Sequence, residues 1–313
     1  MKRPKGASLL QMGAAITQRL RKAHSEHMFS RVAVEQFVKG FSGKHYQTRV
    51  LFQLAQVNGI VSYECMNITG CEPIECVCVG GRGGVDTAHR SQGYCLCRYM
   101  ASQVRTRFGL RRPPRSEGSD GTSRNSKGTA SNARTSIKHV VHTWVEAAFP
   151  DLQLPQTRNS TPRSDAFDMC DAVVVAAFHV CTLAAWSMLL DVAYPCGAPP
   201  AVRAVLLPDT YAPPVRLAAP DHALRQYIDA FACTRRVRAS LDRDVLAETA
   251  QQCLRSIIRA KLQERGVEAP QMETVEDDAI LDMPDANIAF RVAKMFVADV
   301  HEVMAHRIPG GAL

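Results

Sequence analysis

Apolar residues in the first part of the chain alternate between helical spacing and short unbroken runs. Residues 5–25 and 44–59 carry apolar side chains at helical spacing, which predicts two helices. The run Val32-Ala33-Val34 between them predicts a buried strand over 30–38, and a further strand is expected after Gly59. This alternation of helices and strands is typical of an α/β protein.

The same alternation continues into the middle of the chain. Residues 94–109 predict a strand followed by a short helix, and a helix begins near Ser136 and stops at Pro150. Ala172 to Leu190 is almost wholly apolar and close to the length of a bilayer-spanning helix. Aspartates bracket this span and no Lys or Arg flanks it, so we favour a buried helix over a membrane span.

Two domains are expected from the change in pattern near residue 196. Residues 1–195 form the α/β core in this interpretation, and residues 196–313 form a helical C-terminal extension. The extension carries amphipathic segments at 220–265 and 284–306, with an acidic linker between them.

Two segments interrupt the core and predict insertions. Residues 68–92 are rich in glycine, but their GGRGG run lacks the lysine and Ser/Thr of a phosphate-binding loop. Residues 110–136 are poor in apolar residues and rich in Ser, Gly and Arg, which predicts disorder. Arg111 and Arg112 begin this basic loop, which is either simply solvated or follows a nucleic-acid backbone.

The net charge of +8 and the pI of about 9.0 suit a polyanionic partner. The chain has 11 cysteines, whose placement favours reduced core residues over disulfides or a zinc site. No acidic residue precedes Glu26, and this basic start is similar in composition to a mitochondrial transit segment, although it also fits an amphipathic helix.

Three acidic residues stand at the margins of apolar segments. Glu35 ends the predicted strand, and Asp168 and Asp171 open the apolar helix at a spacing that places both carboxylates on one face. The aspartate pair also fits an ordinary acidic helix start. If all three converge, they stay ionised only with a cation between them, and magnesium prefers such oxygen ligands.

The order of several short motifs resembles that of the RuvC-like Holliday-junction resolvases, a family that includes mitochondrial resolvases and splicing-factor relatives. The motifs are VAVEQFV, LAQVNGIV, SQVRTRFG, IKHVVHTWV and DMCDAVVVAAFH, and the resemblance covers about residues 8–185. The resemblance implies an RNase H-like α/β fold, in which a mixed sheet is flanked by helices.

The resemblance also implies an activity and a set of site residues. Glu35, Asp168 and Asp171 match the catalytic carboxylates that hold Mg²⁺ or Mn²⁺, and Arg105 and Lys138 match basic residues near the scissile phosphate. The implied protein is a mitochondrial homodimer that cleaves four-way DNA junctions. RNA is a possible alternative ligand, and the helical extension is a possible site for protein partners.

The sequence departs from this family at its start. The family begins with a strand that carries a first catalytic aspartate, whereas no aspartate precedes Glu35 here. Three explanations follow: the protein begins upstream of this sequence, it is a non-catalytic relative in a mitochondrial ribonucleoprotein, or another acid such as Asp209 substitutes. A fourth reading treats the resemblance as accidental and the chain as a membrane or structural protein built around 172–190.

Overall fold

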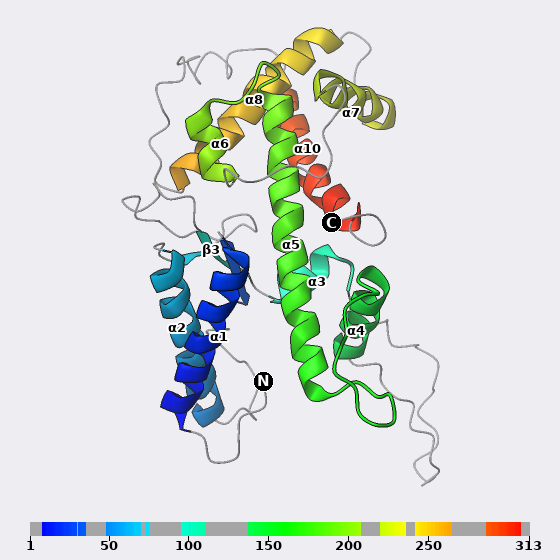
Figure 1. Ribbon diagram of the computed structural model, residues 1–313. Helices are drawn as coiled ribbons and strands as arrows, with labels where there is room; N and C mark the ends of the chain where they lie inside the picture. Colours follow the sequence, from blue (N-terminus) through cyan, green and yellow to red (C-terminus); the bar gives the residue numbers. More distant parts are fainter. Residues whose placement is uncertain are drawn as a thin grey trace, which may run out of the picture.

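The structure is a computed structural model (Figure 1). It describes the following residues: 8–29, 31–35, 48–69, 73–75, 95–99, 101–110, 137–207, 220–235, 242–264 and 286–307.

The first part of the chain pairs two helices beside a short strand. Its elements are α1 (Leu9–His27), β1 (Arg31–Glu35) and α2 (Thr48–Thr69). Ser8 caps α1 in a reciprocal capping box with Gln11, which satisfies backbone N–H groups at the helix start. Gly13 allows the two helices to approach closely, since a Cβ atom there would lie 3.2 Å from the Ile60 side chain.

The sheet has three short strands, and all its strand pairs are parallel. β3 (Cys95–Tyr99) lies in the centre, with β1 on one side and β2 (Pro73–Glu75) on the other. Parallel neighbours need a crossover connection, and α2, which contacts both β1 and β3, supplies the helix between them. β2 lies inside the segment 68–92 that was expected to be an insertion.

The prediction of an RNase H-like mixed sheet is wrong. Within the described residues the sheet contains no antiparallel strand pair, its strands are three to five residues long, and helices make up most of the remainder. The strand expected after Gly59 is also absent, because α2 continues to Thr69. Ser62, Glu64 and Cys65 are buried and Tyr63 is exposed, and two adjacent buried residues fit a helical inner face rather than strand alternation.

The middle of the chain forms a helical layer around a first apolar cluster. Its elements are α3 (Ala101–Arg107), α4 (Ile137–Ala148) and α5 (Ser164–Ala193). The cluster joins β3, α3, α4 and the first half of α5, and its buried members include Tyr99, Val104, Phe108, Val141, Val145, Val174 and Phe178.

The last part of the described chain is helical. Its elements are α6 (Pro200–Leu206), α7 (Pro220–Arg235), α8 (Arg243–Glu264) and α10 (Ala286–Arg307). With the second half of α5 they enclose a second apolar cluster, whose buried members include Trp186, Leu189, Leu190, Leu254, Ile258 and Phe296.

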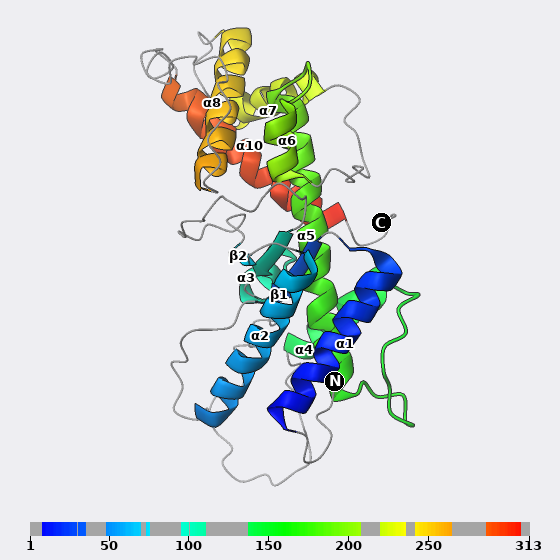
Figure 2. The ribbon, with the colours of Figure 1, turned by 60° about the vertical axis from the view of Figure 1, so that its left-hand side comes forward.

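Helix α5 contributes buried residues to both apolar clusters. Figures 1 and 2 show its first half beside α3 and α4 and its second half among α6, α8 and α10. α10 returns toward the first cluster, where Ala305 is buried and the Cys181 thiol donates a hydrogen bond to the Met304 carbonyl oxygen. The boundary predicted at residue 195 therefore stays a prediction, since one continuous helix supplies both cores.

The apolar span predicted at 172–190 lies in α5, and burial in the fold explains both its apolar composition and the raised pKa values of its thiols. Among the described residues, α5 alone is long and apolar enough to cross a membrane, and 72% of its apolar window is buried inside the fold, as in a core helix. Burial raises the pKa of Cys170 to about 11 and that of Cys181 to about 12, so both stay protonated thiols. Cys76 and Cys78 lie outside the described residues.

Candidate active site

Glu35 stands at the end of β1, where the backbone is held by α2. The Asn58 side chain donates a hydrogen bond to the Glu35 carbonyl oxygen at 3.0 Å. In the sheet register Glu35 lies beside Tyr99, the last residue of β3. Since α3 begins two residues after Tyr99, the ends of β1 and β3 and the start of α3 meet in one region.

Arg105 and Asp171 form a close ion pair between α3 and α5. The Arg105 Nη2 atom donates a hydrogen bond to Asp171 Oδ1 at 2.8 Å. Their side chains are 23% and 17% exposed, so both groups are largely screened from water. A charge-assisted bond in such surroundings is stronger than one at an open surface.

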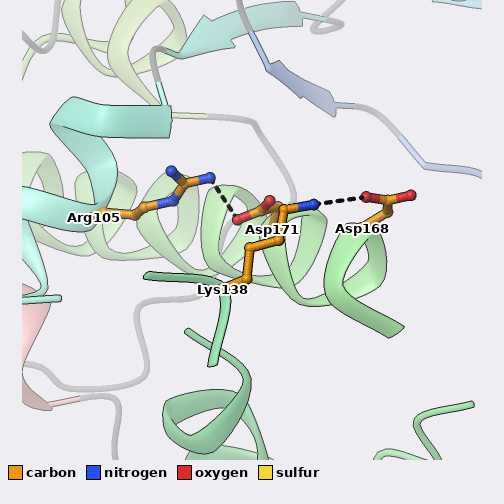
Figure 3. Close-up of polar contacts among 4 residues, drawn as sticks. All are labelled: Arg105, Lys138, Asp168 and Asp171. Carbon is orange, nitrogen blue, oxygen red and sulfur yellow. Dashed lines mark hydrogen bonds and ion pairs between the residues drawn. The ribbon is translucent and has the colours of Figure 1, made fainter. Parts of the chain in front are cut away.

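Lys138 and Asp168 form a looser pair closer to solvent. The Lys138 ammonium lies 3.9 Å from Asp168 Oδ1, and the two side chains are 53% and 67% exposed. Figure 3 shows both aspartates projecting from α5 toward basic side chains that come from two other helices. Sequence spacing suggested that the two aspartates have similar surroundings. The structure shows a difference, because the Asp171 side chain is largely buried and the Asp168 side chain is exposed.

The electrostatics of Glu35 tie the five residues together. Desolvation raises the pKa of the Glu35 carboxyl, the carboxylates of Asp171 and Asp168 raise it further, and the cations of Arg105 and Lys138 act in the opposite direction. All four charged groups are therefore within electrostatic reach of Glu35. Arg105 of α3 thus pairs with Asp171 and Lys138 of α4 pairs with Asp168, whereas Glu35 of β1 is connected to these four residues only through the effect of their charges on its pKa.

The raised pKa of Glu35 gives a prediction for stability. The folded protein keeps the Glu35 proton to higher pH than the unfolded chain does. The free energy of unfolding therefore falls, and the protein becomes less stable, as pH rises from 4.5 through the folded-state pKa. Glu35→Gln removes this loss. We expect the variant to melt at a higher temperature than the wild type at about pH 7, and the gap to narrow at about pH 4, by circular dichroism.

The control for this experiment is Glu248→Gln, which removes an exposed carboxylate from α8 outside the cluster. We expect no such pH-dependent gain from it. A Glu35→Gln variant less stable than the wild type at neutral pH would mean that the Glu35 carboxylate stabilises the fold, contrary to its electrostatic surroundings.

Glu35, Asp168 and Asp171 fit a magnesium site in their donor chemistry but not in their arrangement. Carboxylate oxygens are the ligands that Mg²⁺ prefers, and the acids here outnumber the neighbouring cations. However, within the described ranges no group of three or more His, Cys, Asp or Glu residues is placed to hold a metal ion. Asp171 is instead held by Arg105.

Sequence reasoning missed the buried support behind the cluster. The Tyr99 hydroxyl and His179 Nδ1 lie 2.6 Å apart, and this hydrogen bond links the end of β3 to α5 next to the Glu35 register position. A histidine inside an apolar helix was the available signal. Phe167 was also missed: its ring packs against His139 and His142 of α4 and lies 6.0 Å from the Lys138 ammonium.

Several sequence-based site predictions fall outside the described residues. Arg111 and Arg112, which were expected to contact nucleic acid, belong to this group, as does Asp209. Most of the basic segment 110–136 lies there too. These assignments stay predictions.

Comparison with known proteins adds no relative. No family model matches the chain, and neither a curated protein nor a solved structure matches it. The described residues therefore define a structural class only: a largely helical protein with one short parallel sheet.

Proposed function

We propose that this chain is a metal-dependent endonuclease that cleaves four-way DNA junctions. The observation that supports the proposal is the pair of aspartates on α5, each beside a cation, whose charges all act on the Glu35 carboxyl. The motif order, which resembles that of junction resolvases, supports the choice of substrate, and the net charge of +8 suits a nucleic acid. The proposal does not depend on an RNase H-like sheet.

Each residue has a distinct role in this proposal. Glu35, Asp168 and Asp171 are the groups that would hold Mg²⁺ or Mn²⁺, which would activate water and stabilise the leaving oxygen of a phosphodiester. Lys138 is exposed beside Asp168 and would bind a DNA phosphate as a point charge. Arg105 has a planar fork of donors that suits either a carboxylate or a phosphate.

Action on a four-way junction also suggests an assembly and a location. A symmetric junction needs two cuts, which a homodimer would place by its own twofold symmetry. A mitochondrial location accords with the acid-free basic start of the chain. Both points remain part of the proposal.

A second candidate is a catalytically silent protein that binds DNA or RNA within a mitochondrial ribonucleoprotein. The ion pair between Arg105 and Asp171 favours it, because a guanidinium already neutralises one of the three carboxylates. In this reading Lys138, Arg105 and the basic loop bind phosphates, while the C-terminal helices contact protein partners.

One assay separates the two candidates. The protein is incubated with a labelled four-way DNA junction or with a linear duplex of the same sequence, with Mg²⁺ or with EDTA. The proposal expects nicks in the junction alone and only with Mg²⁺. Binding that weakens steeply with salt, without any cleavage, would support the silent binding protein instead. Neither cleavage nor binding would contradict both.

A further inference from the structure

Helix α2 has an exposed face without a charged side chain. Between residues 55 and 68 the exposed positions recur every three or four residues, so they lie on one side of the helix. Glu64 is the one charged residue of this stretch, and it is 4% exposed and ion-paired to α1. The exposed positions, which we call the uncharged face of α2, are Gln56, Gly59, Tyr63 and Asn67.

This composition differs from that of the other long helices. Each of the other described helices of twelve or more residues exposes at least one charged side chain, as is usual for a helix surface in water. Examples are Arg21 of α1, Lys138 of α4, Asp168 of α5, Arg225 of α7, Asp244 of α8 and Arg291 of α10. Interface cores are instead depleted of charge and enriched in aromatic residues, and Tyr63 is 62% exposed.

Gly59 is a second, independent indication of a partner. A glycine in a helix interior destabilises the helix relative to alanine. At Gly13 the fold gives a reason, because a Cβ atom there would lie 3.2 Å from the Ile60 side chain of α2. At Gly59 a Cβ atom would meet no other group within 4 Å. The close approach that Gly59 permits is therefore not used within the chain.

We propose that the uncharged face of α2 binds the same face of a second copy of this chain, with the two helices antiparallel. When the helices cross between Gly59 and Tyr63, each tyrosine packs over Gly59 of the partner subunit. Gln56 then lies beside Asn67 of the partner subunit, and two side-chain amides can donate to and accept from each other. The face is thus self-complementary, as a twofold interface requires.

Charge favours a second copy over other occupants. Each copy carries a formal net charge of +8, so two copies repel each other where their basic surfaces meet. The uncharged face lets them approach without opposing like charges. A nucleic acid or an acidic protein would instead be bound by lysine and arginine, which this face lacks. The inference rests on the proposed function only in that it locates the homodimer suggested there.

Sedimentation velocity of the full chain at increasing concentrations tests the inference. We expect a dimer with a micromolar dissociation constant, because one pair of helices buries less than a standard interface. Tyr63→Lys removes the aromatic side chain and places two like charges across the twofold axis. It should raise the dissociation constant by at least about 30-fold, the effect of losing a hot-spot residue. Val245→Lys, which adds the same charge at a half-exposed position of α8, should leave it unchanged.

Gly59→Gln tests the close approach without adding charge. The open space beside Gly59 and the better helix propensity of glutamine should keep the variant as helical as the wild type by circular dichroism. Its dissociation constant should rise by at least about 10-fold, because the added side chain overpacks the contact. If Tyr63→Lys does not fold, Gly59→Gln decides alone. A wild type that stays monomeric, or a dimer that a folded variant leaves unchanged, overturns the inference.

The result is independent of the cleavage assay. Junction cleavage by a protein whose self-association is unchanged by Tyr63→Lys contradicts the inference alone. A dimer that Tyr63→Lys dissociates, in a protein that cleaves no junction, supports the inference and contradicts the endonuclease.

Discussion

Asp168→Asn is expected to reduce junction cleavage by more than about 100-fold, the scale on which loss of one group stabilising transition-state charge acts. Asp168 is 67% exposed and its ion pair with Lys138 is long, so an amide of the same size should leave the fold intact. The variant should bind the junction at least as tightly as the wild type, because it removes a negative charge beside the DNA. Cleavage of a labelled junction under single-turnover conditions measures the first effect, and a gel-shift titration measures the second.

Asp168 separates chemistry from stability better than Asp171 does. Replacing Asp171 would leave the largely buried Arg105 guanidinium without its carboxylate partner, and this change would itself lower the stability of the fold. Glu248→Gln is the control, because it removes one exposed acidic charge from a distant part of the sequence. If Asp168→Asn cleaves as fast as Glu248→Gln, Asp168 has no catalytic role and the endonuclease assignment loses one of its three carboxylates.

The positions of the three acidic residues within their strand and helix were predictable from local pattern. Glu35 follows an apolar run, and Asp168 and Asp171 lie three residues apart in a helix, so their placement follows from the periods of strands and helices. The pairing of Arg105 with Asp171 was not predictable in this way. It depends on how α3 packs against α5 across 66 positions of sequence, which spacing alone does not determine.

The fold was less predictable than the site. Ile60 and Val61 after Gly59 are β-branched and apolar, which favours a strand locally, but packing of α2 against α1 extends the helix through them. Likewise Pro73–Glu75 is a strand inside a segment whose glycines indicated a loop. In both places a tertiary contact overrides the local preference, and the resulting sheet is parallel rather than mixed.

Leu254→Ala is expected to lower the free energy of unfolding by about 2–5 kcal/mol, because it removes a fully buried side chain and leaves a cavity. Leu254 lies on α8, in the second apolar cluster. Since α5 contributes to both clusters, the loss should also destabilise the first cluster, which contains the candidate site. Urea unfolding followed by fluorescence measures both effects.

The two tryptophans of the chain report on the clusters separately. Trp186 is buried in the second cluster, and Trp144 packs against the first, so Trp144→Phe and Trp186→Phe backgrounds each leave one probe. Leu254→Ala should shift both probes to the same lower midpoint, because a continuous helix makes unfolding cooperative across the two cores. Val245→Ala, at a half-exposed position of α8, should change the unfolding free energy by less than about 0.5 kcal/mol. A lower urea midpoint seen only by Trp186 would instead show that the C-terminal helices unfold alone. In that case α5 would not couple them to the first apolar cluster.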